Sequence, residues 1–292
     1  MLLFGYCRIL YLSKEENAFV FEIVKAIILG IVEGLTEFAP VSSTGHMIIV
    51  DDMWLKTQDF LGSSSANTFK IVIQLGSILA VVVVMWKRLL SIVGLYHIEG
   101  QTKNHRFNLL HVLIGIIPAG VLGLLLENYI DEHLFSIETV IIGLFIGAIF
   151  MIIADKFAWK KPRVTSLDDL TYLQALQVGA IQCLSLWPGF SRSGSTISGG
   201  VLLGLDHRTA ADFTFIMAVP IMAGASGLSL LKHYKEINPD DMMFYIAGFV
   251  SAFIFALLSI KFFLKLISRI KLVPFAIYRI VLAIVLAIIV FA

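Results

Sequence analysis

The chain has 292 residues, of which 58% are hydrophobic and only 15% are charged. A soluble globular core does not need that much apolar sequence, so the composition predicts a membrane protein. The net charge is +1, from 22 basic and 21 acidic residues. Nucleic-acid-binding proteins usually carry an excess of basic residues, so this balance argues against nucleic acid as a partner. The two cysteines are too few for a disulfide framework.

The first seventeen residues are mixed in character, and no small-residue cleavage site follows their apolar part. We therefore interpret residues 1–17 as an extension at the membrane surface and not as a signal peptide. Residues 18–292 are predicted to form a single membrane domain. Six stretches in it are about 20 residues long, enough to cross a hydrocarbon core as helices. They lie near 69–87, 107–126, 138–156, 209–231, 242–265 and 272–292.

Two further apolar regions are interrupted in the middle by Pro, Gly and Ser. The region from Ala18 to Trp54 is broken at APVSSTG, and the region from Tyr172 to Leu205 is broken at WPGFSRSG. The arm from Ser43 to Trp54 would be about 18 Å long as a helix, too short to cross a membrane. Both regions are predicted to be re-entrant helix hairpins, whose non-helical tips are tolerated at membrane depth when protein or water surrounds them.

Loop charges predict the orientation of the chain in the membrane. The positive-inside rule places three basic segments in the cytoplasm, namely 87–107, 156–170 and 261–274. Two other connecting segments then lie outside, 127–137 and 232–241. These assignments agree only if each hairpin returns to the side from which it entered, the first from outside and the second from inside. We therefore predict an all-α integral membrane protein with six transmembrane helices and two re-entrant hairpins, arranged as an inverted-topology repeat of about 18–156 and 170–292.

A weak internal repeat supports the inverted arrangement. Aligned without gaps, EGLTEFAPVSSTGHMI and QCLSLWPGFSRSGSTI share four identical residues, among them Ser42 with Ser191 and Gly45 with Gly194. Inverted repeats with broken helices that meet at the membrane midplane are typical of transporters. The architecture alone therefore leaves transport and catalysis both open.

The first hairpin carries ionisable and nucleophilic side chains at its tip. Glu33 and Glu37 are four residues apart, which puts both carboxylates on one helix face. Because an ionised group at the bilayer centre costs about 2.5–3.5 kcal/mol on insertion scales, these carboxylates are expected to share a polar cavity. Ser43 and His46 follow one helical turn apart, and an imidazole can take a hydroxyl proton. The alternative is that the two glutamates only pair with basic residues and hold the hairpins together.

The second tip carries Arg192 at the start of a helical arm. A guanidinium beside the free N–H groups of a helix N-terminus forms an anion site that suits phosphate, although an ion pair with Glu33 or Glu37 competes with this interpretation. A second arginine, Arg279, lies in the last predicted helix and is expected to snorkel to the cytoplasmic interface. The small polar residues of both tips either contact a substrate or serve only helix packing, and they include Ser42, Thr44, Ser193 and Ser195.

Together, EGLTEFAPVSSTGH and PGFSRSGSTISGG resemble the undecaprenyl-diphosphatase family, the bacterial bacitracin-resistance proteins. The resemblance extends from about Ala18 to the C-terminus. It implies an inner-membrane phosphatase that converts undecaprenyl diphosphate to undecaprenyl phosphate and recycles the carrier for cell-wall synthesis. It also implies a divalent cation, Mg²⁺ or Ca²⁺, and a site that opens to the outer, periplasmic face. The family's functional residues fall on Glu33, Glu37, Ser43, His46 and Arg192, with Ser191 and Thr196 nearby.

The mechanism that we favour places the diphosphate at the two tips and the lipid chain between helices. Glu33 and Glu37 hold the metal or place a water, Arg192 neutralises developing charge, and Ser43 attacks with His46 as base. Attack by His46 itself or by water stays open. The rival hypothesis is a transporter or flippase of a lipid-linked phosphate, which would need no nucleophile. The oligomeric state, a homodimer included, is also left open by the sequence.

Overall fold

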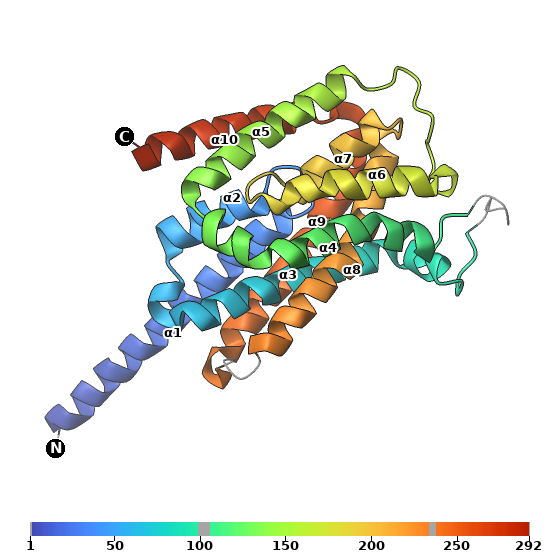
Figure 1. The fold of residues 1–292 in the computed structure, drawn as a ribbon. Helices are drawn as coiled ribbons and strands as arrows, with labels where there is room; N and C mark the ends of the chain where they lie inside the picture. Colours follow the sequence, from blue (N-terminus) through green and yellow to red (C-terminus); the bar gives the residue numbers. More distant parts are fainter. Residues whose placement is uncertain (1, 99–105, 234–237, 292) are drawn as a thin grey trace.

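A computed structural model of the chain describes residues 2–98, 106–233 and 238–291, and within these ranges it contains helices and no sheet. The first half consists of α1 (Leu2–Thr36), α2 (Ser43–Met47), the π-helix η1 (Ile48–Leu55), α3 (Gln58–Ile92), α4 (Leu109–His133) and α5 (Ile137–Lys156). The second half consists of η2 (Leu167–Asp169), α6 (Tyr172–Gln182), η3 (Cys183–Leu186), α7 (Arg192–Leu202), α8 (His207–His233), η5 (Pro239–Asp241), α9 (Met242–Ile270) and α10 (Val273–Phe291) (Figure 1).

Six helices of the described ranges, in α3, α4, α5, α8, α9 and α10, are long and apolar enough to cross a membrane, and they coincide with the six predicted spans. The chain is therefore a multi-pass membrane protein. Several helices extend beyond the predicted limits, α3 and α4 the furthest. α3 begins at Gln58, before a break in helical geometry at Gly62, and α4 continues to His133. These extra turns are rich in polar residues, which lower the hydropathy of a segment without preventing helix formation.

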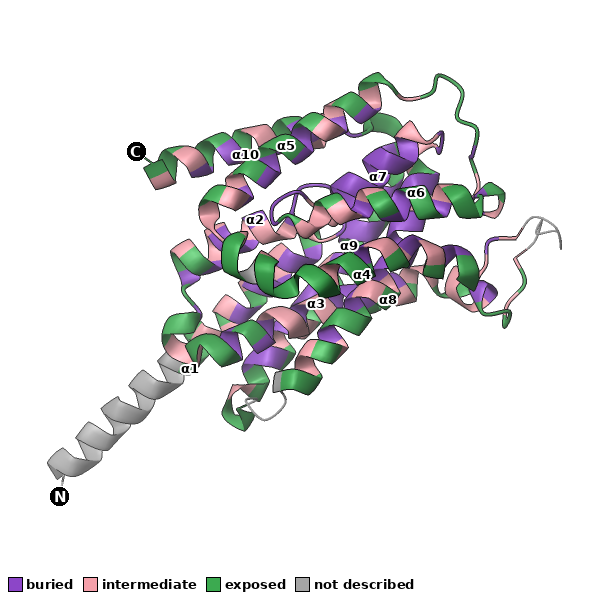
Figure 2. Cartoon of the chain, viewed as in Figure 1, coloured by how far each residue is buried: buried purple, intermediate pink, exposed green. Residues whose placement is uncertain are grey.

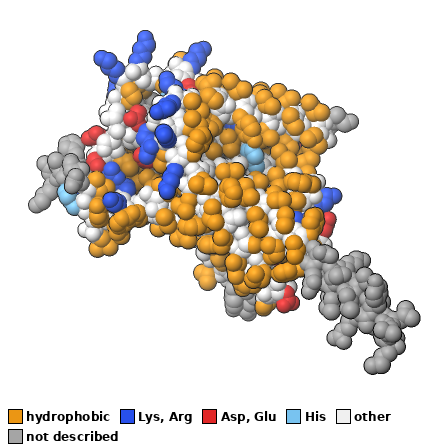
Figure 3. All heavy atoms as spheres, turned by 180° about the vertical axis from the view of Figure 1, so that it is seen from behind, with side chains coloured by type: hydrophobic (Ala, Val, Ile, Leu, Met, Phe, Trp, Pro, Cys, Tyr) orange, Lys and Arg blue, Asp and Glu red, His pale blue; other side chains and the backbone are white. Residues whose placement is uncertain are grey.

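The exterior of the bundle matches a lipid environment. Many exposed residues of the helices are large and apolar, and apolar side chains cover much of the face that Figure 3 shows, while Figure 2 shows the exposed positions along the outer sides of the helices. Basic side chains gather at one end of the molecule in Figure 3. Two ion pairs link separate elements, Arg88 of α3 with Asp168 of η2 at 3.0 Å and Asp155 of α5 with His207 of α8 at 2.6 Å. Of the segments predicted to be cytoplasmic, residues 99–105 lie outside the described residues.

Close packing against α9 fixes α1, which carries Glu33 and ends one residue before Glu37. A Cβ atom added to Gly34 would lie 2.5 Å from the carbonyl oxygen of Ala252, so only glycine permits this approach of the two backbones. The hydroxyls of Ser251 and Ser259 donate to the carbonyls of Ile27 and Leu35 at 3.1 and 3.0 Å. Small residues and interhelical hydroxyl bonds are the usual means of helix association in membranes. The glutamate face of α1 is thereby held in one orientation.

The two predicted interruptions are breaks between helices in the structure. α1 ends at Thr36 and the chain becomes helical again at Ser43, while η3 ends at Leu186 and α7 begins at Arg192. The arm from Ser43 to Trp54, expected to be one α-helix, changes to π-helix at Ile48. Apolar periodicity cannot distinguish these two helix types over so few residues. Figure 1 shows the segments around both breaks near the middle of the bundle, between α5 and α9.

Candidate active site

Two serines with the same unusual backbone conformation begin the helices at the site. Ser42 and Ser191 have φ angles of 71° and 74°, a region that non-glycine residues rarely adopt. Each side chain accepts a hydrogen bond from the backbone N–H three residues later, from Gly45 at 3.4 Å and from Gly194 at 3.2 Å. Each serine is thus the N-cap of its helix. The following residue, Ser43 in α2 or Arg192 in α7, is placed at the first helical position.

Glu37 connects these two first residues. The hydroxyl of Ser43 donates to Oε2 of Glu37 at 2.6 Å, and Nη2 of Arg192 donates to Oε1 at 3.0 Å. The side chains of Arg192 and Glu37 are 14% and 8% exposed. The ion pair that the sequence suggested as an alternative for Arg192 is therefore present. Because its other terminal nitrogen, Nη1, reaches the carbonyl of Thr214 only at 3.4 Å, the guanidinium keeps capacity for a further anion.

Glu33 lies one helical turn before Glu37 and is buried, with 4% of its surface exposed. Its Oε1 atom is buried without a hydrogen-bond partner in the described part of the chain. An orphaned carboxylate oxygen beside a second carboxylate fits a hard divalent cation. No group of three or more His, Cys, Asp or Glu side chains suited to a metal occurs within the described ranges. Mg²⁺ commonly binds through one or two carboxylates and completes its shell with water and phosphate oxygens, so two glutamates suffice.

The ring nitrogens of His46 form hydrogen bonds with residues other than Ser43. Its Nδ1 lies 2.8 Å from the carbonyl oxygen of Ser42, and its Nε2 lies 2.6 Å from the hydroxyl of Tyr278 in α10. The hydroxyl of Ser43 donates to Glu37 instead. The structure therefore brings Ser43, Glu37 and Arg192 into direct contact, whereas His46 joins the site through Ser42. Tyr278 was missed in the sequence because no local spacing connects residues so far apart.

Among the small polar residues of the second tip, Ser193 bonds to the first tip and the others donate within their own segment. Ser193 donates to the carbonyl of Ala39 at 3.0 Å, and its hydroxyl lies 3.2 Å from that of Ser191. Thr196 is buried and donates to the carbonyl of Arg192 at 2.8 Å. Ser195 makes the same kind of bond at 2.9 Å. Thr44, in the first tip, is half-buried.

Arg279 corrects one expectation from the sequence. Instead of snorkelling to the membrane interface, it is fully buried. Its Nη2 donates to the carbonyls of Gly143 and Gly189 at 3.2 and 2.9 Å, which ties α10 to α5 and to the second tip. Hydropathy patterns cannot reveal this role because the partners are backbone oxygens, and every chain position supplies one. A methyl group on Gly147 would overlap the guanidinium, so the lack of a side chain at this position makes room for Arg279.

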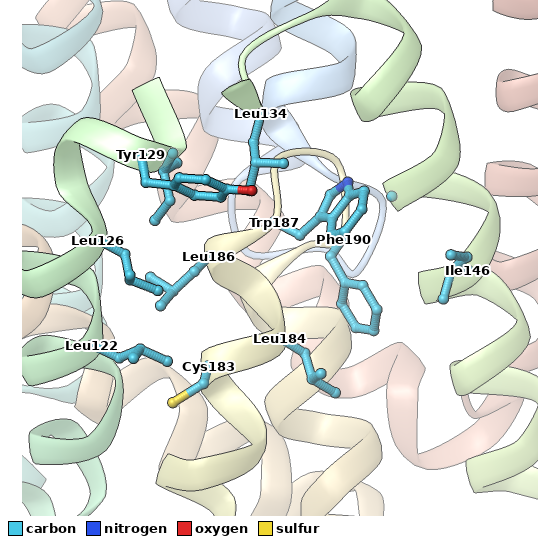
Figure 4. Close-up of a pocket in the computed structure, with 12 residues that line it drawn as sticks. Leu122, Leu126, Tyr129, Leu134, Ile146, Cys183, Leu184, Leu186, Trp187 and Phe190 are labelled. Carbon is cyan, nitrogen blue, oxygen red and sulfur yellow. The ribbon is translucent and has the colours of Figure 1, made fainter. Parts of the chain in front are cut away.

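An apolar pocket of about 350 Å³ adjoins the second tip (Figure 4). Leu122 and Leu126 of α4 form one side, and Leu184, Trp187 and Phe190 come from η3 and the tip. The indole N–H of Trp187 donates to the carbonyl of Thr139 at 2.8 Å, so the polar atom of this side chain is satisfied. Phe190 directly precedes Ser191 in the chain. The pocket therefore gives an apolar chain a place beside the polar site.

The fold and the site define a class of protein: a multi-pass membrane protein with a buried cluster of carboxylates, guanidinium and hydroxyl next to an apolar pocket. Such a cluster can bind a phosphate group, and the pocket suits a lipid. The family model described as bacitracin resistance protein BacA matches residues 26–285. The chain belongs to this family, which confirms the resemblance seen in the sequence.

Curated relatives match the chain over nearly its whole length. An undecaprenyl-diphosphatase of Exiguobacterium sibiricum is 70% identical over 275 residues, covering 93% of this chain and 99% of the relative. An undecaprenyl-diphosphatase of Geobacillus kaustophilus is 67% identical over 267 residues, covering 91% and 97%. A protein of the same name from Staphylococcus aureus strain MRSA252 is 61% identical over 282 residues, covering 94% and 97%.

Proposed function

We infer that the protein hydrolyses undecaprenyl diphosphate to undecaprenyl phosphate and inorganic phosphate. Relatives 60–70% identical over most of the chain carry the name of this enzyme. The observation in the structure that supports hydrolysis best is the contact of one carboxylate, Glu37, with both a hydroxyl and a guanidinium. A nucleophile activated beside a positively charged phosphate ligand is what phosphoryl transfer requires.

We propose that the diphosphate binds between the two tips, on Arg192 and the free N–H groups at the start of α7. A helix N-terminus and a planar guanidinium both favour phosphate. Ser191 and Thr196 shape this end of the site through their contacts within α7. The apolar pocket that ends at Phe190 would take the first isoprene units of the lipid, because it lies next to Ser191 in the chain.

We propose Ser43 as the nucleophile. Its hydroxyl proton is directed at Glu37, so this carboxylate is placed to receive the proton as Oγ forms a bond with the terminal phosphorus. The bond from phosphorus to the bridging oxygen breaks, undecaprenyl phosphate leaves, and water then releases phosphate from the serine. Arg192 offsets the charge that develops on the phosphate. His46 as base, His46 as nucleophile and direct attack by water are the alternatives.

A divalent cation, Mg²⁺ or Ca²⁺, is part of this proposal. The unpartnered oxygen of Glu33 and the neighbouring Glu37 are the residues that would hold it. When bound, such a cation polarises phosphate oxygens and offsets their charge. Glu33 would then contribute mainly through the cation, while Glu37 would also fix Ser43 and Arg192.

We also propose that α1 with α2 and η1, and α6 with η3 and α7, are re-entrant hairpins related by an inverted repeat. Three similarities support it. Ser42 and Ser191 share φ angle and capping role, as their alignment predicts. α1 packs on α9, and its counterpart α6 packs on α4. α4 and α9 are themselves counterparts in the two halves. α3 packs on its counterpart α8, and α5 packs on its counterpart α10. The site would open to the outer side of the inner membrane.

The purified protein in detergent separates an enzyme from a flippase, because a detergent micelle has no second side. Release of inorganic phosphate from undecaprenyl diphosphate requires hydrolysis. We expect the parent protein to release phosphate and Glu37→Gln to release almost none. A folded parent protein that binds the lipid but leaves it intact would favour transport.

A further inference from the structure

The ring of His46 is held from two sides by groups of different chemistry. Its Nδ1 lies 2.8 Å from the carbonyl oxygen of Ser42, and its Nε2 lies 2.6 Å from the hydroxyl of Tyr278. The rings of His46 and Tyr278 are also stacked, with centroids 5.6 Å apart and planes 8° apart. The imidazole is therefore held by the N-cap residue of α2 through Nδ1 and by α10 through Nε2 and the stacked ring.

These contacts determine the tautomer of the ring. A carbonyl oxygen only accepts hydrogen bonds, so Nδ1 of His46 must carry the proton that bonds to Ser42. In the neutral imidazole Nε2 then carries a lone pair and accepts from the hydroxyl of Tyr278. Neither nitrogen is left for Ser43, whose hydroxyl binds Glu37. The carbonyl of Ser42 thus sets the tautomer of His46, and the contact with Tyr278 sets the direction in which Nε2 points.

Tyr278 sits on a helix that is anchored at the same level. The next residue, Arg279, is buried and bonds to the carbonyls of Gly143 in α5 and Gly189 in the second tip. Because successive residues of a helix point about 100° apart, these neighbours reach different elements. Tyr278 contacts the first tip and Arg279 the second, so the backbone of α10 is fixed relative to both. A side chain on such a rigid support can hold a partner in a defined orientation.

We propose that Tyr278 is a positioning residue for the reaction, which fixes the orientation of the His46 ring through its hydroxyl and its stacked ring, while the carbonyl of Ser42 sets the tautomer. The proposal rests on the proposed hydrolysis. The hydroxyl of Tyr278 keeps the Nε2 lone pair of His46 occupied, while the carbonyl of Ser42 keeps the Nδ1 proton on its side.

Tyr278→Phe tests the proposal because it removes the hydroxyl and keeps the stacked ring. We expect kcat for phosphate release in detergent to fall about five- to tenfold, the value of one hydrogen bond, with KM unchanged. In ¹⁵N-histidine NMR spectra the Nε2 resonance of His46, assigned by its loss in His46→Ala, should move, and the Nδ1 resonance should keep the position of a protonated nitrogen.

Tyr172→Phe is the matched control, far from the site in α6. The ring of Tyr172 stacks on His111 with centroids 4.1 Å apart, and its hydroxyl accepts from Asn108 at 3.1 Å. We expect this variant to leave kcat and the His46 resonances unchanged. A kcat of Tyr278→Phe within twofold of the parent, or an unmoved Nε2 resonance, would overturn the proposal. Absence of hydrolysis in the parent protein would instead refute the proposed function, while the NMR comparison still decides the role of Tyr278.

Discussion

Ser43 and Arg192 occupy the same position in two different helices, and each binds a different oxygen of Glu37. Ser43 is the first residue of α2 and Arg192 the first residue of α7, and each follows an N-cap serine with a positive φ angle. The two halves of the chain therefore place unlike side chains, a hydroxyl and a guanidinium, at equivalent points. Glu37 belongs to the first half only, and its two hydrogen bonds join Ser43 and Arg192 in one site.

The role of Arg192 depends on its planar shape as well as its charge. Arg192→Lys keeps the positive charge but loses the fork that can hold a phosphate beside Glu37. We expect the variant to remain folded in detergent and to hydrolyse the lipid diphosphate at least about a hundredfold more slowly. Hydrolysis rates with folding checked by gel filtration provide the measurement. A near-parental rate would mean that Arg192 only neutralises Glu37.

Glu33 is expected to act through a cation. Glu33→Gln keeps the shape of the side chain and removes the charge, so activity should fall at least about a hundredfold and excess Mg²⁺ should restore part of it. The rate as a function of Mg²⁺ concentration is the measurement, and Glu127→Gln, which changes an exposed surface pair with Lys232, is the control. Full activity of the parent protein in excess chelator would eliminate the cation from the account.

The burial of Arg279 predicts that replacing two glycines by alanine changes the stability of the protein differently. An added methyl group at Gly147 would overlap the guanidinium and approach the carbonyl of Phe190, whereas nothing lies within 4 Å of the corresponding position at Gly120. Gly147→Ala should therefore destabilise the fold by about 1–3 kcal/mol, and Gly120→Ala should be neutral or stabilising. Thermal unfolding in detergent compares them. Equal Tm values for both variants and the parent would argue against this packing.

The orientation in the membrane can be tested by cysteine labelling in intact cells. With the native cysteines replaced by serine, Lys160→Cys should react with a membrane-impermeant maleimide only after the cells are permeabilised, since basic segments lie inside. Glu132→Cys, in the acidic segment at the end of α4, should react without permeabilisation. Labelling of Lys160→Cys from outside would reverse the orientation and with it the outward-facing site.

Much of the fold could be predicted because lipid imposes simple rules on sequence. Six apolar segments of sufficient length gave six helices, and the breaks at APVSSTG and WPGFSRSG coincide with the ends of α1 and η3. The π-helix at Ile48–Leu55 was not predictable, because it preserves the apolar character of an α-helix. The break at Gly62 was not predictable either, because it lies in the polar first turns of α3, before the predicted span.

In the site, sequence spacing identified residues better than it identified their partners. The spacing of Glu33 and Glu37 predicted a shared face, and Arg192 is indeed paired with Glu37. The spacing of Ser43 and His46 suggested a direct bond, but a serine at the first position of a helix can turn back to a carboxylate that precedes the helix. The contacts of Arg279 and Tyr278 depend on the packing of α10, which no local pattern contains.

Phosphate release by Ser43→Ala and His46→Ala, measured with the same cation and lipid diphosphate, tests the central claim that Ser43 attacks the diphosphate beside Glu37 and Arg192. The account predicts that Ser43→Ala falls to near background, because the attacking oxygen is lost. His46→Ala should lose less, because the proton of Ser43 is directed at Glu37 and not at His46. A Ser43→Ala enzyme working within about tenfold of the parent, together with an inactive His46→Ala, would contradict the account and make His46 the attacking group.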